Sequence, residues 1–369
     1  MSELPVVLLE ERRCADGHIL AVATLNSERS LNSLSLEMID LLLPAMQRWA
    51  SDERVVAVFL QGAGQKAFCA GGDVRRICVG VRENGIEDPY AQQFFTAEYR
   101  LDYLIHTYPK PVIVWGQGIV MGGGTGLMCG ASHRVVTENS RLAMPEISIG
   151  LYPDVGGSHF LSRLPGRLGL FIGMTGVNLN AADALYAGFA DHVLEGERRE
   201  LVVAELLALA WSADATLHAA QVTGLLDAGE RPLLAASALQ AHEAVIEERT
   251  SGAGLADIYK ALTAPVVDDA WLDRTAKTLA KGSPTSAALI HRQWLRGRDM
   301  SLADVFREEL TLSTQCARHP DFIEGVRALL VDKDNTPRWQ PATLDAVTEA
   351  WIDGHYVEPW KGEHPLASL

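Results

Sequence analysis

The sequence predicts an α/β protein in which strands and helices alternate up to about residue 190 and helices dominate after that point. Short apolar runs with strand character recur in the first half, and segments whose apolar residues have helical spacing separate them. Beyond that point, helix-like segments follow one another with little strand signal between them. Two glycine-rich clusters directly follow buried strands, and such clusters mark sharp turns or a close approach of the backbone to a ligand.

The first elements follow from local patterns. Residues 6–26 contain two strand-like runs on either side of Asp16-Gly17, a dipeptide typical of a tight hairpin. Residues 35–52 begin with a serine and then carry apolar residues at roughly helical spacing, which predicts a helix. Further along, we expect strands at 55–62, 111–118 and 133–139, a helix at 88–109, and a short helix that begins in the glycine-rich run at 122–130.

The second half predicts helices and an irregular tail. Helix-like patterns occupy residues 197–215, 238–250, 270–282 and 301–319. Residues 351–369 are rich in proline, glycine and tryptophan, and we expect them to pack as an irregular cover. Near residues 188–196 the pattern changes from alternating strands and helices to helices alone, which predicts two regions, residues 1–200 and residues 201–369.

Composition indicates an ordinary globular protein whose charge disfavours nucleic acid and anionic membranes but not a small phosphorylated ligand. Hydrophobic residues make up 48% of the 369 residues, and 32 basic against 47 acidic side chains give a net charge of −15. That field repels nucleic acid and anionic membranes, so we expect neither as a partner. The five cysteines form no CxxC pair, the first residues do not resemble a signal peptide, and no apolar run approaches the ~20 residues of a membrane span. We therefore expect a cytoplasmic location.

The glycine clusters at residues 66–74 and 118–130 have two interpretations. The second cluster begins a helix, whose free N–H groups favour a developing negative charge. Two such amides that converge on one point would form an oxyanion hole. In the alternative interpretation, both clusters are only tight turns.

Two motifs and two histidines are weak leads. Residues 62–67 satisfy the dinucleotide pattern GxGxxA, but the turn residues that follow do not continue the required helix. Residues 146–150 nearly match a nucleophile elbow around Ser148, although Glu146 replaces its first glycine. His133 and His159 lack metal-ligand spacing, so we expect ordinary histidines and no metal.

Glu146 and Asp154 stand in an otherwise apolar and turn-rich run, residues 144–166. Asp154 follows a proline and precedes two glycines, so it could simply cap the next helix. An unpaired acid at Glu146 would be costly to bury without a partner or a task. Burial would raise its pKa, which suits general acid or base chemistry. Residue types alone leave both interpretations open.

Four segments together resemble the enoyl-CoA hydratase/isomerase (crotonase) superfamily. They are LNSERSLNSLSLEMI, KAFCAGGDV, GIVMGGGTGLMCG and AMPEISIGLYPDVGG, in the order and spacing of that family. The chain looks closest to the 3-hydroxyisobutyryl-CoA hydrolase branch. Gly126 stands where hydratases carry a catalytic glutamate, Asp154 is typical of the hydrolases, and residues 282–294 and 319–344 resemble that branch's helical extension.

The resemblance implies a fold and roles for particular residues. It implies a spiral of repeated ββα units with the CoA site in residues 1–200, and a helical region over the acyl pocket in residues 201–369. Gly72 and Gly123 would supply the oxyanion-hole amides, and Glu146 and Asp154 would be catalytic. The residues expected to bind CoA or substrate are Arg29, Ser30, Leu31, Ala70, Gly71, Asp73 and Gly126.

The activity implied is hydrolysis of a short 3-hydroxyacyl-CoA, in particular 3-hydroxyisobutyryl-CoA from valine breakdown. CoA is part of the substrate, so no separate cofactor is expected. One alternative is an enoyl-CoA hydratase or isomerase with a rearranged acid pair, since one fold hosts many reactions. Another is a non-catalytic acyl-CoA-binding or assembly subunit. The family also implies a homo-oligomer, unless the C-terminal extension replaces a partner's helices.

Overall fold

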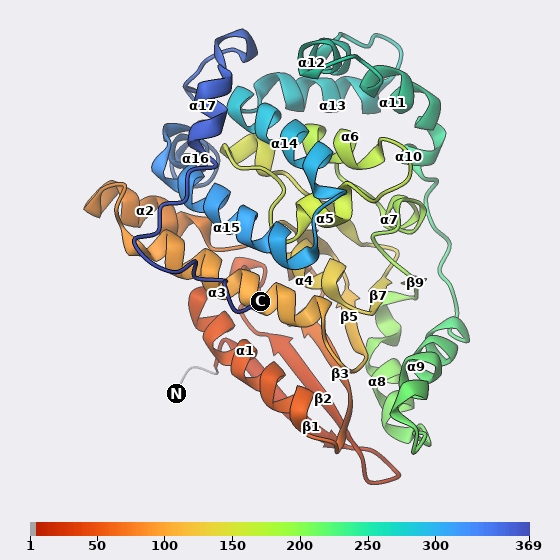
Figure 1. Cartoon of the computed structure of the whole chain (residues 1–369). Helices are drawn as coiled ribbons and strands as arrows, with labels where there is room; N and C mark the ends of the chain where they lie inside the picture. Colours follow the sequence, from red (N-terminus) through yellow and green to blue (C-terminus); the bar gives the residue numbers. More distant parts are fainter. Residues whose placement is uncertain (1–4) are drawn as a thin grey trace. The chain divides into compact units, whose positions relative to one another are not determined.

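The computed structural model describes residues 5–369, which form two compact units built from alternating segments of the chain (Figure 1). The first unit contains residues up to 72, residues 100–142 and residues 179–237. The second contains residues 73–99, 143–178 and 238–369. Helix α3 (Pro89–His106) contributes residues to both units.

The first unit is built on two sheets. The larger has six strands in the order β1-β2-β3-β5-β7-β9, in which β1 and β2 form an antiparallel hairpin and the other neighbours are parallel. Its strands are β1 (Val7–Arg13), β2 (Ile19–Leu25), β3 (Val55–Gly62), β5 (Val112–Gly116), β7 (His133–Val136) and β9 (His192–Val193). The smaller sheet has the order β4-β6-β8, with β4 (Ala67–Cys69), β6 (Ile119–Met121) and β8 (Arg141–Ala143).

Helices cover the larger sheet. The helices of this unit are α1 (Leu36–Ser51), α4 (Gly123–Gly130), α7 (Ala181–Ala187), α8 (Arg199–Ala208) and α9 (His218–Asp227). Helix α1 packs on the first strands of the sheet, and α8 and α9 pack against each other (Figure 1). Sheet residues such as Phe59 and Trp115 share one apolar core with Leu206 of α8 and Leu226 of α9.

The second unit is almost entirely helical. Its helices before residue 179 are α2 (Val74–Asn84), the first part of α3, the 3-10 helix η2 (Glu146–Ile149), α5 (Gly157–Leu161) and α6 (Leu168–Thr175). Those after residue 237 are α10 (Ala238–Ala241), α11 (Glu243–Thr250), α12 (Leu255–Thr263), α13 (Ala270–Lys281), α14 (Pro284–Gly297), α15 (Leu302–Arg318), α16 (Pro320–Val326) and α17 (Glu349–Gly354).

Aromatic rings join the helices around α3. Tyr99 of α3 lies 5.9 Å from Phe306 of α15, measured between ring centroids, and Phe95 lies 6.4 Å from Phe322 of α16. All four rings are buried. Such ring pairs add roughly 0.5–1.5 kcal/mol beyond the area they bury. They fix α3 against α15, and both helices contribute to the acidic site described below.

The order of elements confirms the repeated ββα units. In chain order the units are β1-β2-α1, β3-β4-α2 and β5-β6-α4, followed by β7 and β8. Asp16-Gly17 forms the hairpin turn as predicted, and Ser35 caps α1 by accepting the Met38 N–H. Helix α2 was not predicted. The prediction of an irregular tail was wrong at its start, because the Thr348 side chain accepts the Trp351 N–H and caps α17.

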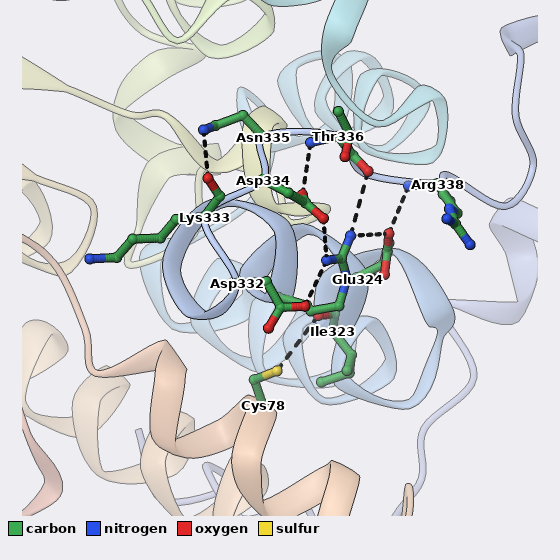
Figure 2. A network of polar contacts seen from close by, with 10 residues as sticks. Cys78, Ile323, Glu324, Asp332, Lys333, Asp334, Asn335, Thr336 and Arg338 are labelled. Carbon is green, nitrogen blue, oxygen red and sulfur yellow. Dashed lines mark hydrogen bonds and ion pairs between the residues drawn. The ribbon is translucent and has the colours of Figure 1, made fainter.

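Residues 324–338 form a network of ion pairs around Arg327 (Figure 2). Its guanidinium pairs with Glu324 at 2.8 Å, with Asp332 at 2.8 Å and with Asp334 at 2.7 Å. Glu324 also accepts the backbone N–H of Arg338, which ties the end of the loop to α16. One cation therefore organises three carboxylates.

Arg327→Ala is expected to loosen residues 332–338 without unfolding the protein. The substitution leaves three carboxylates facing one another with no cation between them, and like charges at this distance repel. Limited proteolysis should then cut this loop faster than in the wild type. Arg338→Ala is the control, because Arg338 makes its hydrogen bond to Glu324 with its backbone N–H, which the substitution keeps. Equal cleavage rates in the wild type and Arg327→Ala would contradict the prediction.

Candidate active site

The two glycine-rich segments of the first unit lie against each other. They follow β4 and β6, which run parallel and are neighbours in the smaller sheet. A Cβ on Gly71 would lie 3.3 Å from the Met121 carbonyl oxygen, and one on Gly124 would lie 2.3 Å from the Cys69 carbonyl oxygen. Real Cβ atoms do not come within 2.3 Å of a backbone oxygen, so only glycine at position 124 allows the two segments to lie this close together.

Strand β4 is enclosed by backbone on other sides as well. A Cβ on Gly62 would lie 2.5 Å from the Ala67 carbonyl oxygen, and one on Gly118 would lie 2.2 Å from the Lys66 carbonyl oxygen. With Gly124, three glycines press on the carbonyl oxygens of residues 66–69. The position of the segment after β4 is therefore set by backbone contacts.

The candidate oxyanion-hole residues occupy these segments. Gly72 forms a parallel bridge with Leu34, and Gly123 is the first residue of α4. The N–H groups in the first turn of a helix have no partner within that helix. The Gly123 N–H is therefore able to donate a hydrogen bond to an acceptor outside α4. That these two amides bind one carbonyl oxygen stays a prediction.

The residues predicted to bind CoA are only partly brought together. The Ala70 N–H donates to the Leu31 carbonyl at 3.1 Å, so the segment that carries Arg29, Ser30 and Leu31 lies beside Ala70 and Gly71. Leu31 has a left-handed backbone, with φ of 55°. Of the remaining two, Gly126 is buried within α4, and Asp73 immediately precedes α2.

Glu146 and Asp154 are both buried in the second unit, each 4% exposed. Glu146 begins η2, and its Oε2 atom has no hydrogen-bond partner among the described residues. Burial, and then the charge of Asp154, raises the pKa of Glu146 well above its usual value. Burial also raises the pKa of Asp154 to about 6. The pair therefore has the perturbed titration that acid–base or nucleophilic chemistry uses.

The side chain of Asp154 does not cap the helix that follows. Helix α5 is preceded by Gly156 and has no side-chain cap. Instead, the Tyr99 hydroxyl donates to Asp154 Oδ2 at 2.5 Å and also contacts Ser313 Oγ at 2.6 Å. The Tyr99 and Ser313 hydrogen bonds lower the pKa of Asp154 and partly oppose the effect of burial. The structural interpretation of Asp154 as a helix cap was thus wrong.

Glu98 is a third buried acid that sequence reasoning missed. It lies on α3 next to Tyr99, is 2% exposed, and its Oε1 atom has no hydrogen-bond partner among the described residues. Burial raises the pKa of Glu98 well above its usual value, and the charges of Asp154 and then Glu146 raise it further. Helical spacing from Phe94 and Phe95 places Glu98 on the apolar face of α3, and that signal was available in the sequence.

The raised pKa of Asp154 predicts a contribution to stability that depends on pH. Between its ordinary value of 3.8 and the folded value of about 6, the unfolded chain ionises while the folded protein keeps the proton. Stability is therefore intact below about pH 4 and falls as the pH rises through about 6, by roughly 3 kcal/mol in all.

Thermal unfolding of the wild type and Asp154→Asn across this pH range checks the prediction. The variant does not titrate at this position. Its melting temperature relative to the wild type should therefore rise between about pH 4 and pH 7. A difference that stays constant or falls over that range would contradict it.

The weak leads from the sequence are structural. Residues 62–67 run from the end of β3 into β4, so no helix follows the GxGxxA pattern. The ring of His133 contacts Ser132 Oγ and the Ala219 carbonyl, which makes it an ordinary buried histidine. Burial, and then Arg163, lowers the pKa of His159 to about 4, so its ring is neutral near pH 7.

Residues 5–369 contain neither a candidate metal site nor a candidate membrane-spanning helix. Within that range, no cluster of three or more histidine, cysteine or acidic side chains is arranged to hold a metal ion. Nor does any helix in the described range have the length and apolar character needed to cross a membrane.

Known proteins resemble this chain over nearly its whole length. The family model described as enoyl-CoA hydratase/isomerase matches residues 20–356. A Danio rerio protein named 3-hydroxyisobutyryl-CoA hydrolase, mitochondrial, is 41% identical over 336 residues, which is 90% of this chain and 85% of that protein. The Homo sapiens protein of the same name is 36% identical over 354 residues, or 95% and 88% of the two chains.

Two solved structures share the fold. One is titled a carnitinyl-CoA dehydratase from Mycobacterium thermoresistibile, with 35% identity, a TM-score of 0.85 and 99% of both chains covered. The other is titled an enoyl-CoA hydratase from Rhodobacter sphaeroides 2.4.1, with 31% identity, a TM-score of 0.83 and coverage of 96% and 98%. The names of the relatives thus divide between hydrolases and enzymes that add or remove water.

Proposed function

The chain belongs to the enoyl-CoA hydratase/isomerase family, an acyl-CoA enzyme family also called the crotonase superfamily, and from this premise we propose that it hydrolyses a short 3-hydroxyacyl-CoA thioester. The substrate proposed is 3-hydroxyisobutyryl-CoA, which would give 3-hydroxyisobutyrate and CoA in valine breakdown. Curated relatives that carry this activity in their names support the choice. The cytoplasmic location and the homo-oligomer stay predictions, and the named relatives are mitochondrial.

The observation that carries the proposal is the buried pair Glu146 and Asp154 together with a glycine at position 126. Hydration of a C=C bond in this family uses two carboxylates to hold water, and one of them would stand at Gly126. Thioester hydrolysis needs one carboxylate at the acyl carbon and a second group near the substrate hydroxyl. Glu146 and Asp154 suit those two tasks.

In the proposed mechanism, Glu146 is the nucleophile and reacts in its ionised form, which burial makes the minor form in the free protein. Its carboxylate oxygen forms a bond to the thioester carbonyl carbon, and the charge that develops on the carbonyl oxygen is held by the Gly72 and Gly123 N–H groups. Each such donor contributes roughly 3–4 kcal/mol to the transition state. The C–S bond then breaks, and CoA leaves as a thiolate that takes up a proton.

Water completes the reaction. It attacks the mixed anhydride, releases the hydroxy acid and restores the Glu146 carboxylate. Asp154, whose pKa is about 6, would accept the substrate hydroxyl hydrogen or move the proton of the attacking water. The alternative in which Glu146 activates water as a general base uses the same residues.

A second candidate function is hydration or isomerisation of a short enoyl-CoA. Glu98 favours it, because this third buried acid has an oxygen with no partner among the described residues and could replace the acid missing at Gly126. The titles of the two solved structures favour it as well.

Thiol release from four substrates tests the proposal. The purified protein would be assayed with 3-hydroxyisobutyryl-CoA, 3-hydroxypropionyl-CoA, acetyl-CoA and crotonyl-CoA side by side. We expect fast CoA release from the two hydroxyacyl thioesters alone. Consumption of crotonyl-CoA without release of CoA would establish the second candidate, and tight CoA binding without turnover would indicate a non-catalytic subunit.

A further inference from the structure

Glu309 of α15 is a buried carboxylate that holds the backbone just after Asp154. Its side chain is 0% exposed. Oε2 accepts the Gly156 N–H at 2.7 Å, and Oε1 accepts the Ser158 N–H at 2.9 Å. Burial raises the pKa of Glu309 to about 8, and these two N–H donors oppose that rise. Both carboxylate oxygens are thus engaged by a segment 153 positions away in the chain.

The segment that Glu309 holds is strained and buried. Val155 and Gly156 have φ of 54° and 85°, both in the left-handed region. A β-branched residue such as Val155 rarely adopts this conformation and keeps it only where its surroundings fix it. The N–H groups of Gly156 and Ser158 are buried and would lose their acceptor without Glu309, and a buried donor without an acceptor is destabilising.

The same helix also holds the side chain of Asp154. Ser313 lies four residues after Glu309 on α15, and positions four apart share one face of a helix. Its Oγ atom is 2.6 Å from the Tyr99 hydroxyl, which donates to Asp154 Oδ2 at 2.5 Å. Helix α15 therefore contacts the main chain after Asp154 through Glu309. It reaches the carboxylate of Asp154 through Ser313, whose hydroxyl contacts Tyr99 of α3.

We propose that Glu309 is a positioning residue for Asp154. By fixing the geometry of the turn at residues 154–158, Glu309 sets the rate of the chemical step that Asp154 assists. This proposal rests on the catalytic role proposed for Asp154. Glu309 itself does not touch the substrate in this scheme, so its substitution should change kcat and leave the KM for acyl-CoA nearly unchanged. The effect should also disappear when Asp154 is already disabled.

A double-mutant cycle tests the proposal. Thiol release from 3-hydroxypropionyl-CoA would be measured for the wild type, Glu309→Gln, Asp154→Asn and the double variant. An amide offers one acceptor in place of two, so Glu309→Gln should lower kcat about 10- to 100-fold through misplacement of Asp154. In the Asp154→Asn background the same change should have less than about a twofold effect, because the two residues act as one unit.

Glu308→Gln is the matched control. It makes the same chemical change one position away, where Glu308 pairs with Arg296 and does not contact the turn. We expect its kcat to equal that of the wild type. A full loss of kcat from Glu309→Gln in the Asp154→Asn background, or a loss expressed only in KM, would overturn the proposal.

Glu309→Asp keeps the test decisive if Glu309→Gln does not fold. It retains a carboxyl group but shortens the side chain by one methylene and so weakens the hydrogen bonds from the Gly156 and Ser158 N–H groups, and a lower kcat with the same non-additivity with Asp154→Asn is expected. If the wild type consumes crotonyl-CoA but releases no thiol, the proposed function is wrong. The same four proteins would then be compared by their kcat for hydration of crotonyl-CoA, which tests Glu309 independently of the proposed hydrolysis. If the wild type acts on neither substrate, both proposals are wrong.

Discussion

Glu146→Gln is expected to lower the rate of CoA release from 3-hydroxyisobutyryl-CoA by at least about a thousandfold, since loss of a nucleophile leaves only binding and the oxyanion hole. An amide cannot form the mixed anhydride or take a proton from water. The protein should still fold, because burial already favours the uncharged form of this side chain. Single-turnover thiol release and thermal unfolding measure the two properties independently.

Glu308→Gln again serves as the control for Glu146→Gln, because it changes another glutamate of the second unit that lies in an ion pair. It should keep normal turnover. Near-normal thiol release by Glu146→Gln, with an unchanged melting temperature, would show that hydrolysis does not use Glu146 and would overturn the proposed mechanism.

Asp154→Asn is expected to reduce kcat on 3-hydroxyacyl-CoA about a hundredfold and to reduce turnover of acetyl-CoA much less. Asparagine cannot accept a proton, and its neutral oxygen bonds a substrate hydroxyl more weakly than a carboxylate does. The ratio of the two rates measures how far Asp154 acts on the hydroxyl. An equal loss on both substrates would show that Asp154 serves only the acyl carbon or the fold.

Tyr99→Phe separates the charge of Asp154 from its hydrogen bond. The variant keeps the carboxylate and removes the hydroxyl that donates to Asp154 Oδ2. Because that hydrogen bond lowers the pKa of Asp154, its loss should raise the pKa above about 6. The acid side of the kcat/KM profile should then move to higher pH, and an unchanged profile would mean that Asp154 does not titrate in the rate-limiting step.

Local patterns predicted the longer strands and helices of the first half because these depend on short-range signals, but the short strands β4, β6, β8 and β9 were not predicted. The Asp16-Gly17 turn sets the β1–β2 register, and the apolar run at 55–62 is β3 in full. Helix α17 was missed because its Thr348 cap lies just before the tail that was expected to be irregular. The glycine and proline residues of the tail favoured an irregular structure over the helix that the single capping residue Thr348 indicates.

The candidate site was less predictable because its partners are distant in the chain. The resemblance supplied Glu146 and Asp154, but no local pattern indicated that Tyr99 would donate to Asp154 from α3, 55 positions away. Glu309 lies farther still along the chain, within an ordinary amphipathic helix. Pairings of this kind depend on tertiary contacts that no spacing rule within one sequence encodes.

The enclosure of β4 by backbone has a consequence for how this protein can diversify. No substitution of a side chain on β4 can make room for a larger residue at Gly62, Gly118 or Gly124, because each of them abuts a main-chain carbonyl oxygen. Mutational drift at these positions is therefore blocked, whatever happens nearby. A mutant library aimed at new substrates should therefore leave Gly62, Gly118 and Gly124 unchanged and vary other positions.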